Sequence, residues 1–202
     1  TCANGLLSDP ADAVVSGSTA DASGPFYFVY LLAARETEPS IAGLQCGITY
    51  ENHQPGDLYN GSGVDVFGWT LCAAQEFQTP GVDQWPRPGG GNLLTWDPDN
   101  NCQTGATAVA GYFYVGAYSP DEMRVTVRPV DGLAKVAKCS GGEVNLEEDR
   151  LGFVSFSGNA SVPGCNPWSE LCGGGVIPVQ KVTWGGIKAL IRSTTTTTGG
   201  AP

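Results

Sequence analysis

Seven cysteines spread along 202 residues constrain this chain more than any other feature. They lie far apart, the chain has no Cys-x-x-Cys pair, and its one histidine is His53. Zinc ligands occur at close spacing, so this pattern argues against a metal site. Dispersed cysteines are typical of disulfide-bonded proteins in an oxidising compartment. We therefore expect a secreted, disulfide-stabilised protein, located outside the cell or at its surface.

The spacing of the cysteines suggests three disulfides, although sequence alone does not fix their connectivity. Cys165 and Cys172 are seven residues apart and flank a short loop, so we expect them to pair. The odd number leaves one thiol, which either cross-links two subunits or stays free at a chain end. The other expected pairs are Cys46 with Cys139 and Cys72 with Cys102, which leaves Cys2 as the odd thiol.

Short apolar segments separated by turn residues predict an all-β fold. The chain has 29 glycines and 14 prolines, and only 15% of its residues are charged. The strongest segment, Phe26–Ala34, is apolar on both faces, so we expect a central, covered strand. Together these features predict a β-sandwich or jelly roll of short antiparallel strands, with a strand extension at one or both termini. Further strands are expected at Ile41–Tyr50, Val64–Ala74, Leu93–Trp96, Ala106–Ala117, Met123–Val127, Leu133–Cys139, Gly152–Ser157 and Val176–Thr183.

Composition divides the chain into five expected parts. Residues 1–24 are small and polar, and form an N-terminal extension. Residues 25–172 form the β-sandwich body, and the three glycines at 173–175 form a flexible hinge. Residues 176–192 form a C-terminal apolar strand, and 193–202 a threonine-rich tail of a kind often O-glycosylated outside cells.

Charge excludes several classes of partner. The chain carries 20 acidic and 10 basic side chains, a formal net charge of −10. A nucleic-acid-binding protein needs a basic footprint, and this chain has none. No apolar run approaches the length of about 18 residues that a membrane-spanning helix needs. The chain begins with Thr1, which fits removal of an export signal. We expect no nucleic-acid partner, no membrane span and no cofactor.

The C-terminal strand is the candidate assembly segment. It holds eight large apolar residues, and burying each is worth about 1.5–3 kcal/mol, so the segment should pack against something. It either forms the last strand of its own body or enters a groove on a neighbouring copy, and such donation builds head-to-tail filaments. The N-terminal extension could equally be the donated strand. The eight residues are Val176, Ile177, Val179, Val182, Trp184, Ile187, Leu190 and Ile191.

Catalytic motifs are missing from the sequence. A Ser–His–Asp triad would depend on His53, which lies in a polar loop, and no Gly-x-Ser-x-Gly is present. Paired carboxylates could serve a glycosidase, but the sequence does not single out a pair. We therefore expect no enzymatic activity.

Two loops have a binding interpretation beside a structural one. Trp85 lies in a Pro/Gly-rich loop, where it would either stack on a sugar ring or close one end of the sandwich. Asp97, Asp99 and Asn101 match the first three ligand positions of a calcium loop, but Cys102 stands where that loop needs glycine, which favours an Asx turn.

Candidate glycosylation sites occur in turn-like and threonine-rich sequence. Two of them are Asn-x-Ser triplets and the others belong to the tail. They are Asn60, Asn159, Thr194, Thr195, Thr196, Thr197 and Thr198.

Seven motifs carry a family resemblance. They are GLQCGITY (43–50), VFGWTLCA (66–73), GNLLTWD (91–97), NCQ (101–103), GYFYVGAYSPD (111–121), RPVDGLAKVAKC (128–139) and TWGGIKAL (183–190). The region from Ile41 onward resembles a group of functionally uncharacterised secreted β-sandwich proteins of environmental bacteria, in which Trp-Gly-x-Ile-Lys endings are common. The resemblance implies secretion, and no enzymatic activity comes with it. In size, disulfides and terminal strands the group is also similar to extracellular fibril subunits.

The leading functional expectation is structural. We expect a subunit of an extracellular fibre or surface assembly, a homopolymer joined head to tail through a terminal β-strand. The second hypothesis is a secreted carbohydrate-binding module that uses Trp85, with glycan as its partner. The third is a secreted hydrolase with unassigned carboxylates.

Overall fold

Two β-sheets make up the body of the protein. The computed structural model describes residues 1–21, 24–35, 37–50, 59–81, 84–158, 162–170 and 172. Within these residues there are eleven strands, three short 3₁₀ helices and no α-helix, so the predicted all-β sandwich is confirmed. Thr1–Cys172 form one compact unit. The predicted hinge, C-terminal strand and tail lie outside the described residues.

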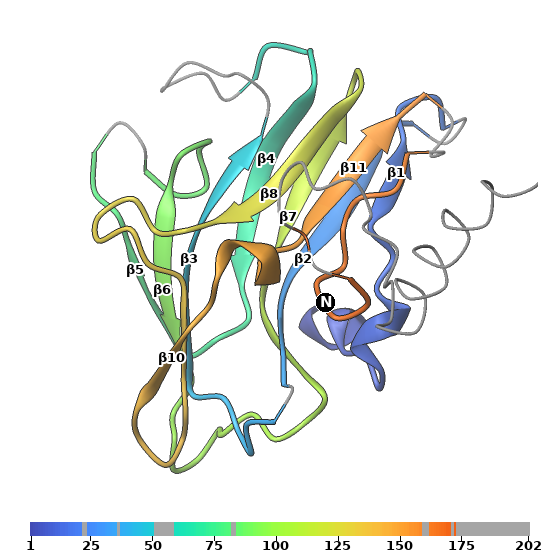
Figure 1. The fold of residues 1–202 in the computed structure, drawn as a ribbon. Helices are drawn as coiled ribbons and strands as arrows, with labels where there is room; N and C mark the ends of the chain where they lie inside the picture. Colours follow the sequence, from blue (N-terminus) through green and yellow to red (C-terminus); the bar gives the residue numbers. More distant parts are fainter. Residues whose placement is uncertain are drawn as a thin grey trace, which may run out of the picture. The chain divides into compact units, whose positions relative to one another are not determined.

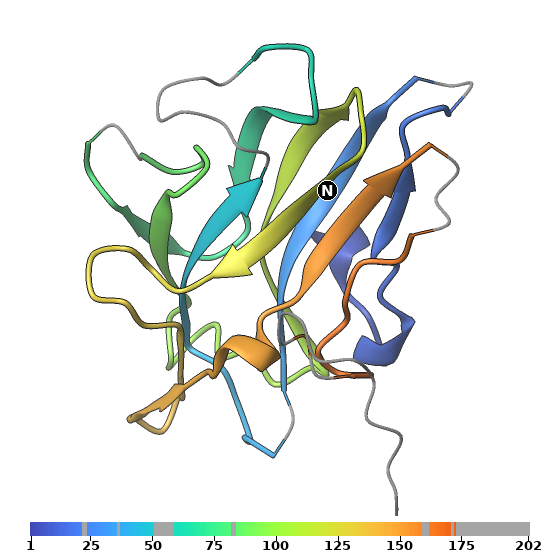
Figure 2. The same cartoon turned by 45° about the horizontal axis from the view of Figure 1, so that its top comes forward.

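The larger sheet has eight strands and a nearly antiparallel arrangement (Figures 1 and 2). β3 (Gly43–Tyr50) is its centre, because it pairs with β6, β8 and β9. The exception to antiparallel pairing is β1 (Ser16–Ser18), which runs parallel to β11 at one edge. The strand order is β1–β11–β8–β3–β6–β5, while β9 pairs with β3 and β10 pairs with β9. The strands not yet bounded are β11 (Phe153–Ser157), β8 (Asp121–Thr126), β6 (Gly91–Thr95), β5 (Gln75–Gln78), β9 (Lys135–Ala137) and β10 (Glu143–Asn145).

The smaller sheet contains β2 (Phe26–Ala34), β7 (Thr107–Ala117) and β4 (Val64–Leu71), in the order β2–β7–β4. The predicted bounds of β2 are confirmed, but its predicted central position is wrong. β2 pairs with β7 alone among the described strands, and its outward side chains Phe26 and Phe28 are exposed. The apolar outer face of β2 is therefore a surface of the body and not a second core.

The core lies between the two sheets. Its centre includes Ile48 of β3, Leu94 of β6 and Val115 of β7, each at most 1% exposed. Trp85 is also buried, with its ring 5.1 Å from that of Trp69 and 5.3 Å from that of Phe113. Trp85 is therefore part of the core, and the interpretation of an exposed sugar-stacking ring is wrong.

The N-terminal segment belongs to the body and is not an appended extension. η1 (Cys2–Gly5) is joined by a disulfide from Cys2 to Cys72, directly after β4. The Leu7 amide donates to Thr107 Oγ1 at 3.0 Å, and β1 then adds to the larger sheet. η2 (Pro10–Asp12) lies between these two contacts.

The disulfides only partly match the predicted connectivity. Cys165–Cys172 is confirmed, but the predicted pairs Cys46–Cys139 and Cys72–Cys102 are wrong, as is an unpaired Cys2. Cys102 pairs with Cys139, which joins the turn after β6 to the end of β9. Cys46 is the unpaired thiol of the described chain, and its position on the central strand β3 places it in the core.

Candidate functional site

Aromatic side chains cover the outer surface of the smaller sheet. Successive side chains of a strand point to opposite sides, so residues 26, 28 and 30 of β2 share the outer face. Across the register, Phe28 lies opposite Tyr114 and Tyr30 opposite Tyr112 of β7. We call the full set the aromatic face: Phe26, Phe28, Tyr30, Tyr59, Phe67, Tyr112, Tyr114 and Tyr118.

A β-bulge in β4 completes the aromatic face. Val66 pairs with Val115 and Gly68 with Tyr114, so Phe67 is the extra residue between them. A bulge changes which way the following side chains point. As a result Phe67 contacts the outer rings, while Trp69, two residues later, packs inward on Phe113 with ring centroids 4.5 Å apart.

The eight rings form one connected surface. Phe28 lies 5.4 Å from Tyr114 and 5.6 Å from Tyr112, measured between ring centroids. Phe26 lies 6.0 Å from Tyr114, and Tyr59 stacks on Phe67 at 5.4 Å. Neighbouring ring planes are mostly inclined, by 86° between Phe28 and Tyr112. The surface is therefore continuous but not a flat platform.

Much of this surface is open to solvent. Phe28 is 61% exposed, Tyr59 58% and Phe26 48%. Single exposed apolar residues are common, but a contiguous apolar patch on a monomer usually marks a contact with a partner or ligand. The aromatic face is thus the best candidate functional site in the described part of the chain.

Local structure shapes both ends of the aromatic face. A Cβ at Gly116 would lie 2.8 Å from the Phe67 ring and 3.0 Å from that of Tyr118, so glycine makes room for both. At the other end, η1 packs against β7, and a side chain at Gly5 would collide with the Tyr30 ring. The N-terminal segment therefore covers one end of the face and leaves the rest open.

The three strands beneath the aromatic face carry almost no charge. Asp65 is their one charged residue, and it is buried, accepting hydrogen bonds from the Asn60 and Gly61 amides at 3.1 and 3.0 Å. The face therefore offers apolar surface, tyrosine hydroxyls and the negative faces of aromatic rings. Such a surface suits an apolar or cationic partner.

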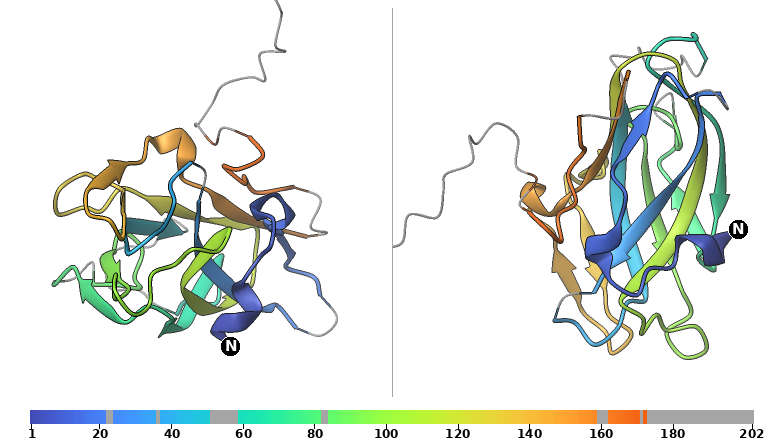
Figure 3. Two further views of the ribbon diagram at one scale, coloured as in Figure 1. Left: turned by 90° about the horizontal axis from the view of Figure 1, so that it is seen from below. Right: turned by 90° about the vertical axis from the view of Figure 1, so that its right-hand side faces the viewer.

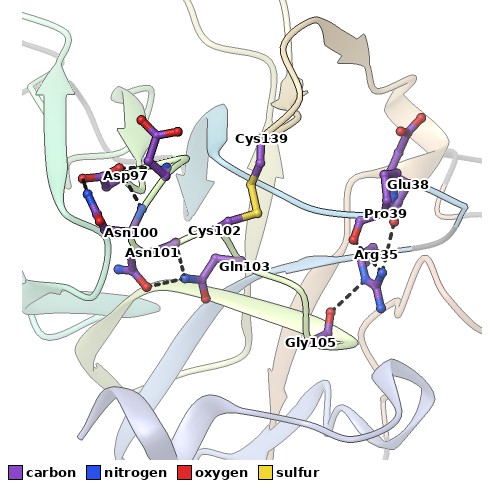
Figure 4. The surroundings of a disulfide bond; sticks show 11 residues. Arg35, Glu38, Pro39, Asp97, Asn100, Asn101, Cys102, Gln103, Gly105 and Cys139 are labelled. Carbon is purple, nitrogen blue, oxygen red and sulfur yellow. Dashed lines mark hydrogen bonds between the residues drawn. A yellow bond between two sulfur atoms is a disulfide. The ribbon is translucent and has the colours of Figure 1, made fainter.

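The loop at Asp97–Asn101, which partly matches a calcium-binding loop in sequence, forms an Asx turn. This is the interpretation that the sequence favours. Asp97 Oδ1 accepts from the backbone amides of Asp99 and Asn100, and Asp97 Oδ2 accepts from the Asn100 side chain (Figure 4). These hydrogen bonds stabilise the charged carboxylate and so lower the pKa of Asp97. The bond from the Asn100 side chain has the largest effect. The carboxylate is thus already occupied, and the described residues contain no group of three metal-binding side chains.

A shallow hollow of about 580 Å³ lies beside this turn. Its lining includes Trp96, Asp97 and Lys138, together with Cys139. Cys139 belongs to the Cys102–Cys139 disulfide that Figure 4 shows. Lys138 already pairs with Glu38 at 2.8 Å, and Trp96 is buried. The hollow therefore presents no free set of polar groups, and we do not assign it a ligand.

The remaining predicted sites fall into two groups. Asn60 is exposed at a turn next to the aromatic face, where a glycan would be accessible. The other predicted positions lie outside the described residues: His53, Asn159, the assembly segment Val176–Arg192 and the threonines Thr194–Thr198. The structure contains no helix long enough to cross a membrane within the residues it describes.

The aromatic face is not predicted from the sequence, although its residues follow a recognisable pattern there. The aromatic residues at 26, 28 and 30 and the motif Tyr112-Phe113-Tyr114 predict strands that are covered on both faces. What the sequence does not show is that, among the described strands, none packs over this side of the smaller sheet. No protein-family model, curated protein or solved structure matches the chain. The family resemblance therefore stays a prediction.

Proposed function

We propose that this protein is a structural subunit of an extracellular fibre or surface assembly, whose copies join head to tail through a terminal β-strand segment. The observation that carries the proposal is the aromatic face. It is a large apolar surface on a body already closed by its own core and three disulfides. A surface of this kind is stabilised when a partner covers it.

The absence of an organised polar site among the described residues also favours a structural role. The aromatic face holds no carboxylate pair, no histidine and no cluster of metal ligands. Rigid β-structure and low charge suit a subunit that is packed among others. Aromatic residues are also the type most enriched at the centres of protein interfaces.

A secreted carbohydrate-binding module is the second candidate function, with tyrosines of the aromatic face as the sugar-stacking residues in place of Trp85. Trp85 is buried, but Tyr114 and Tyr118 are each 40% exposed and combine a stacking ring with a hydroxyl. The inclined rings argue against the flat surface of a crystalline polysaccharide. A single sugar chain could still stack on one or two of them.

Sedimentation velocity and negative-stain electron microscopy of the full chain test the proposal. We expect the wild type to polymerise and the double variant Phe26→Ser/Phe28→Ser to stay monomeric and folded. The matched control is Phe77→Ser, because Phe77 is 54% exposed on β5 of the other sheet. The control should polymerise like the wild type.

Two results would contradict the structural role. One is a wild type that stays monomeric at every concentration reached, and the other is unchanged polymerisation of the Phe26/Phe28 variant. The carbohydrate-binding alternative would be established by two results together. The wild type would be monomeric and co-sediment with an insoluble glycan, and the Tyr114→Ala variant would no longer bind that glycan.

A further inference from the structure

We infer that the occupant of the aromatic face is the segment Val176–Arg192 of the neighbouring copy. The inference rests on the proposed function and adds to it the donor, the acceptor and the chemistry of their contact. It also predicts an open polymer instead of a closed dimer.

The N-terminal segment is already used within its own chain. Cys2 is bonded to Cys72, and the Leu7 amide and carbonyl both bind Thr107 Oγ1. The amides of Ser155 and Gly164 both donate to the Val15 carbonyl, at 3.0 and 2.8 Å. Donating this segment to a neighbour would break the Cys2–Cys72 disulfide and remove β1 from the edge of the larger sheet. Of the two terminal segments considered, Val176–Arg192 is therefore the better donor.

The composition of Val176–Arg192 matches the aromatic face. Three of the ten basic side chains lie in it, Lys181, Lys188 and Arg192, and none of the twenty acidic ones does. The rest of the chain thus carries seven basic against twenty acidic side chains. A cationic, apolar segment is attracted to an acidic body, and its cations can lie over exposed aromatic rings.

The acceptor lacks features that would oppose this segment. The strands β2, β4 and β7 contain no lysine or arginine, so no like charge meets the three cations. Phe26 and Phe28 of the edge strand β2 supply apolar area, while Tyr114 of the middle strand β7 and Tyr118 just after it add hydroxyls. Aromatic side chains of both kinds are enriched at protein interfaces.

The position of Cys172 indicates why the contact extends into a polymer. The Cys172 amide donates to the Asp149 carbonyl in η3 (Glu148–Arg150), and its partner Cys165 pairs with Phe153 of the larger sheet. Figure 3 shows η3 on one side of the sandwich, with β4 and β7 on the other. Cys172, the last described residue before the donor segment, and the acceptor strands therefore lie on opposite sides of the body. Such a heterologous contact propagates unless its rotation happens to close a ring.

Two complementary variants of the full chain test this inference. The acceptor variant is Phe26→Ser/Phe28→Ser, which keeps the donor segment. The donor variant is Val179→Ser/Val182→Ser/Ile187→Ser, which keeps the aromatic face. Its matched control is Thr195→Ser/Thr197→Ser in the threonine tract. Assembly is read by sedimentation velocity.

We expect each variant alone to be monomeric where the wild type and the control polymerise. A 1:1 mixture of the two variants should form dimers and nothing larger, because one intact donor meets one intact acceptor. Losing the buried residues on either side should weaken association by about 100-fold or more.

Other outcomes separate the inference from the proposed function. A donor variant that still dimerises or polymerises, or a mixture that stays monomeric, would overturn the inference and leave the aromatic face as a contact between copies. An acceptor variant that polymerises normally would overturn both.

Discussion

Cys46 is the thiol of the described chain that forms no disulfide, and it is fully enclosed by the core. A buried thiol in apolar surroundings behaves as a small apolar side chain with little reactivity. Burial raises its pKa to about 12. Cys46 is therefore a packing residue of β3 and not a reactive or cross-linking one.

The first prediction concerns its reactivity. The folded protein should resist a thiol-specific reagent, because no thiolate is accessible. Unfolding in denaturant without reductant should release one reactive thiol per chain. The count is checked by absorbance after reaction, with Cys46→Ala as the control that releases none. Two or more thiols would contradict the three disulfides.

The raised pKa also predicts how stability depends on pH. The pKa of the thiol has its ordinary value of 9.0 in the unfolded chain and is about 12 in the folded protein. The contribution of Cys46 to stability is thus fully present below pH 9 and is lost as pH rises from there towards 12, by at most about 1.4 kcal/mol per pH unit. Tyr50, whose pKa is raised first by burial, adds to the loss. Urea unfolding on both sides of pH 9 checks this, and Cys46→Ala should show a smaller decline.

Residue-level reasoning from the sequence was right about local features and wrong about distant pairs. The Asx turn at Asp97 follows from side chains within three residues of it, and Cys165–Cys172 closes a short loop. Cys2–Cys72 spans 70 residues, and its formation depends on η1 meeting the end of β4. Such pairings follow from strand order, which hydrophobic pattern alone does not give.

At the scale of elements, β5 reverses the usual pattern of a strand. Its apolar Phe77 points outward, while Glu76 Oε2 accepts hydrogen bonds from Trp69 Nε1 and Asn92 Nδ2 at 2.9 and 2.8 Å. Trp69 belongs to the smaller sheet and Asn92 to β6. Glu76 thus joins the two sheets, and a charge at an edge strand also discourages pairing with other chains.

The third prediction follows from this contact. Glu76→Ala leaves the fully buried Asn92 amide and the Trp69 indole without their acceptor. We expect a loss of about 1–3 kcal/mol in the free energy of unfolding, since an unsatisfied buried donor costs about that much. Urea denaturation measures it, with Gln75→Ala as the exposed control on the same strand. Equal stability of the two variants would exclude the role of Glu76 between the sheets.

The fourth prediction ranks the disulfides by the loops they close. Cys2–Cys72 and Cys102–Cys139 span 70 and 37 residues, and Cys165–Cys172 spans 7. Chain-entropy reasoning gives about 4 kcal/mol for each long loop and about 2 for the short one. Replacing Cys2 and Cys72 by serine should therefore lower the thermal midpoint more than replacing Cys165 and Cys172. The reverse order would mean that η1 contributes little to the fold.

The strands show what a hydrophobic pattern can and cannot give. The range Phe26–Ala34 was predicted correctly, because a run of β-branched and aromatic residues between turn signals is a local property. Its place at a sheet edge is not local, and neither is the bulge at Phe67 that sends Phe67 and Trp69 to opposite faces. The short β1, β5 and β10 have too few apolar residues to be recognised alone.

For the whole molecule, the distribution of charge and aromatic surface decides what can associate with it. Seven basic and twenty acidic side chains lie outside Val176–Arg192, while the aromatic face is almost uncharged. An acidic body repels its own copies at long range. A cationic segment can offset that repulsion when it reaches a neighbour.

The last prediction therefore concerns salt. Raising sodium chloride from about 0.05 M to about 0.5 M shortens the screening length from about 14 Å to about 4 Å. If the three cations steer Val176–Arg192 to the aromatic face, polymer growth should slow by about tenfold over this range, mainly in the association rate. The variant Lys181→Gln/Lys188→Gln/Arg192→Gln should grow slowly throughout and lose most of this dependence. Light scattering during growth measures both. Salt could instead speed polymer growth equally in both proteins. That result would mean that salt screens the repulsion between acidic bodies, and that apolar contact accounts for assembly without the cations.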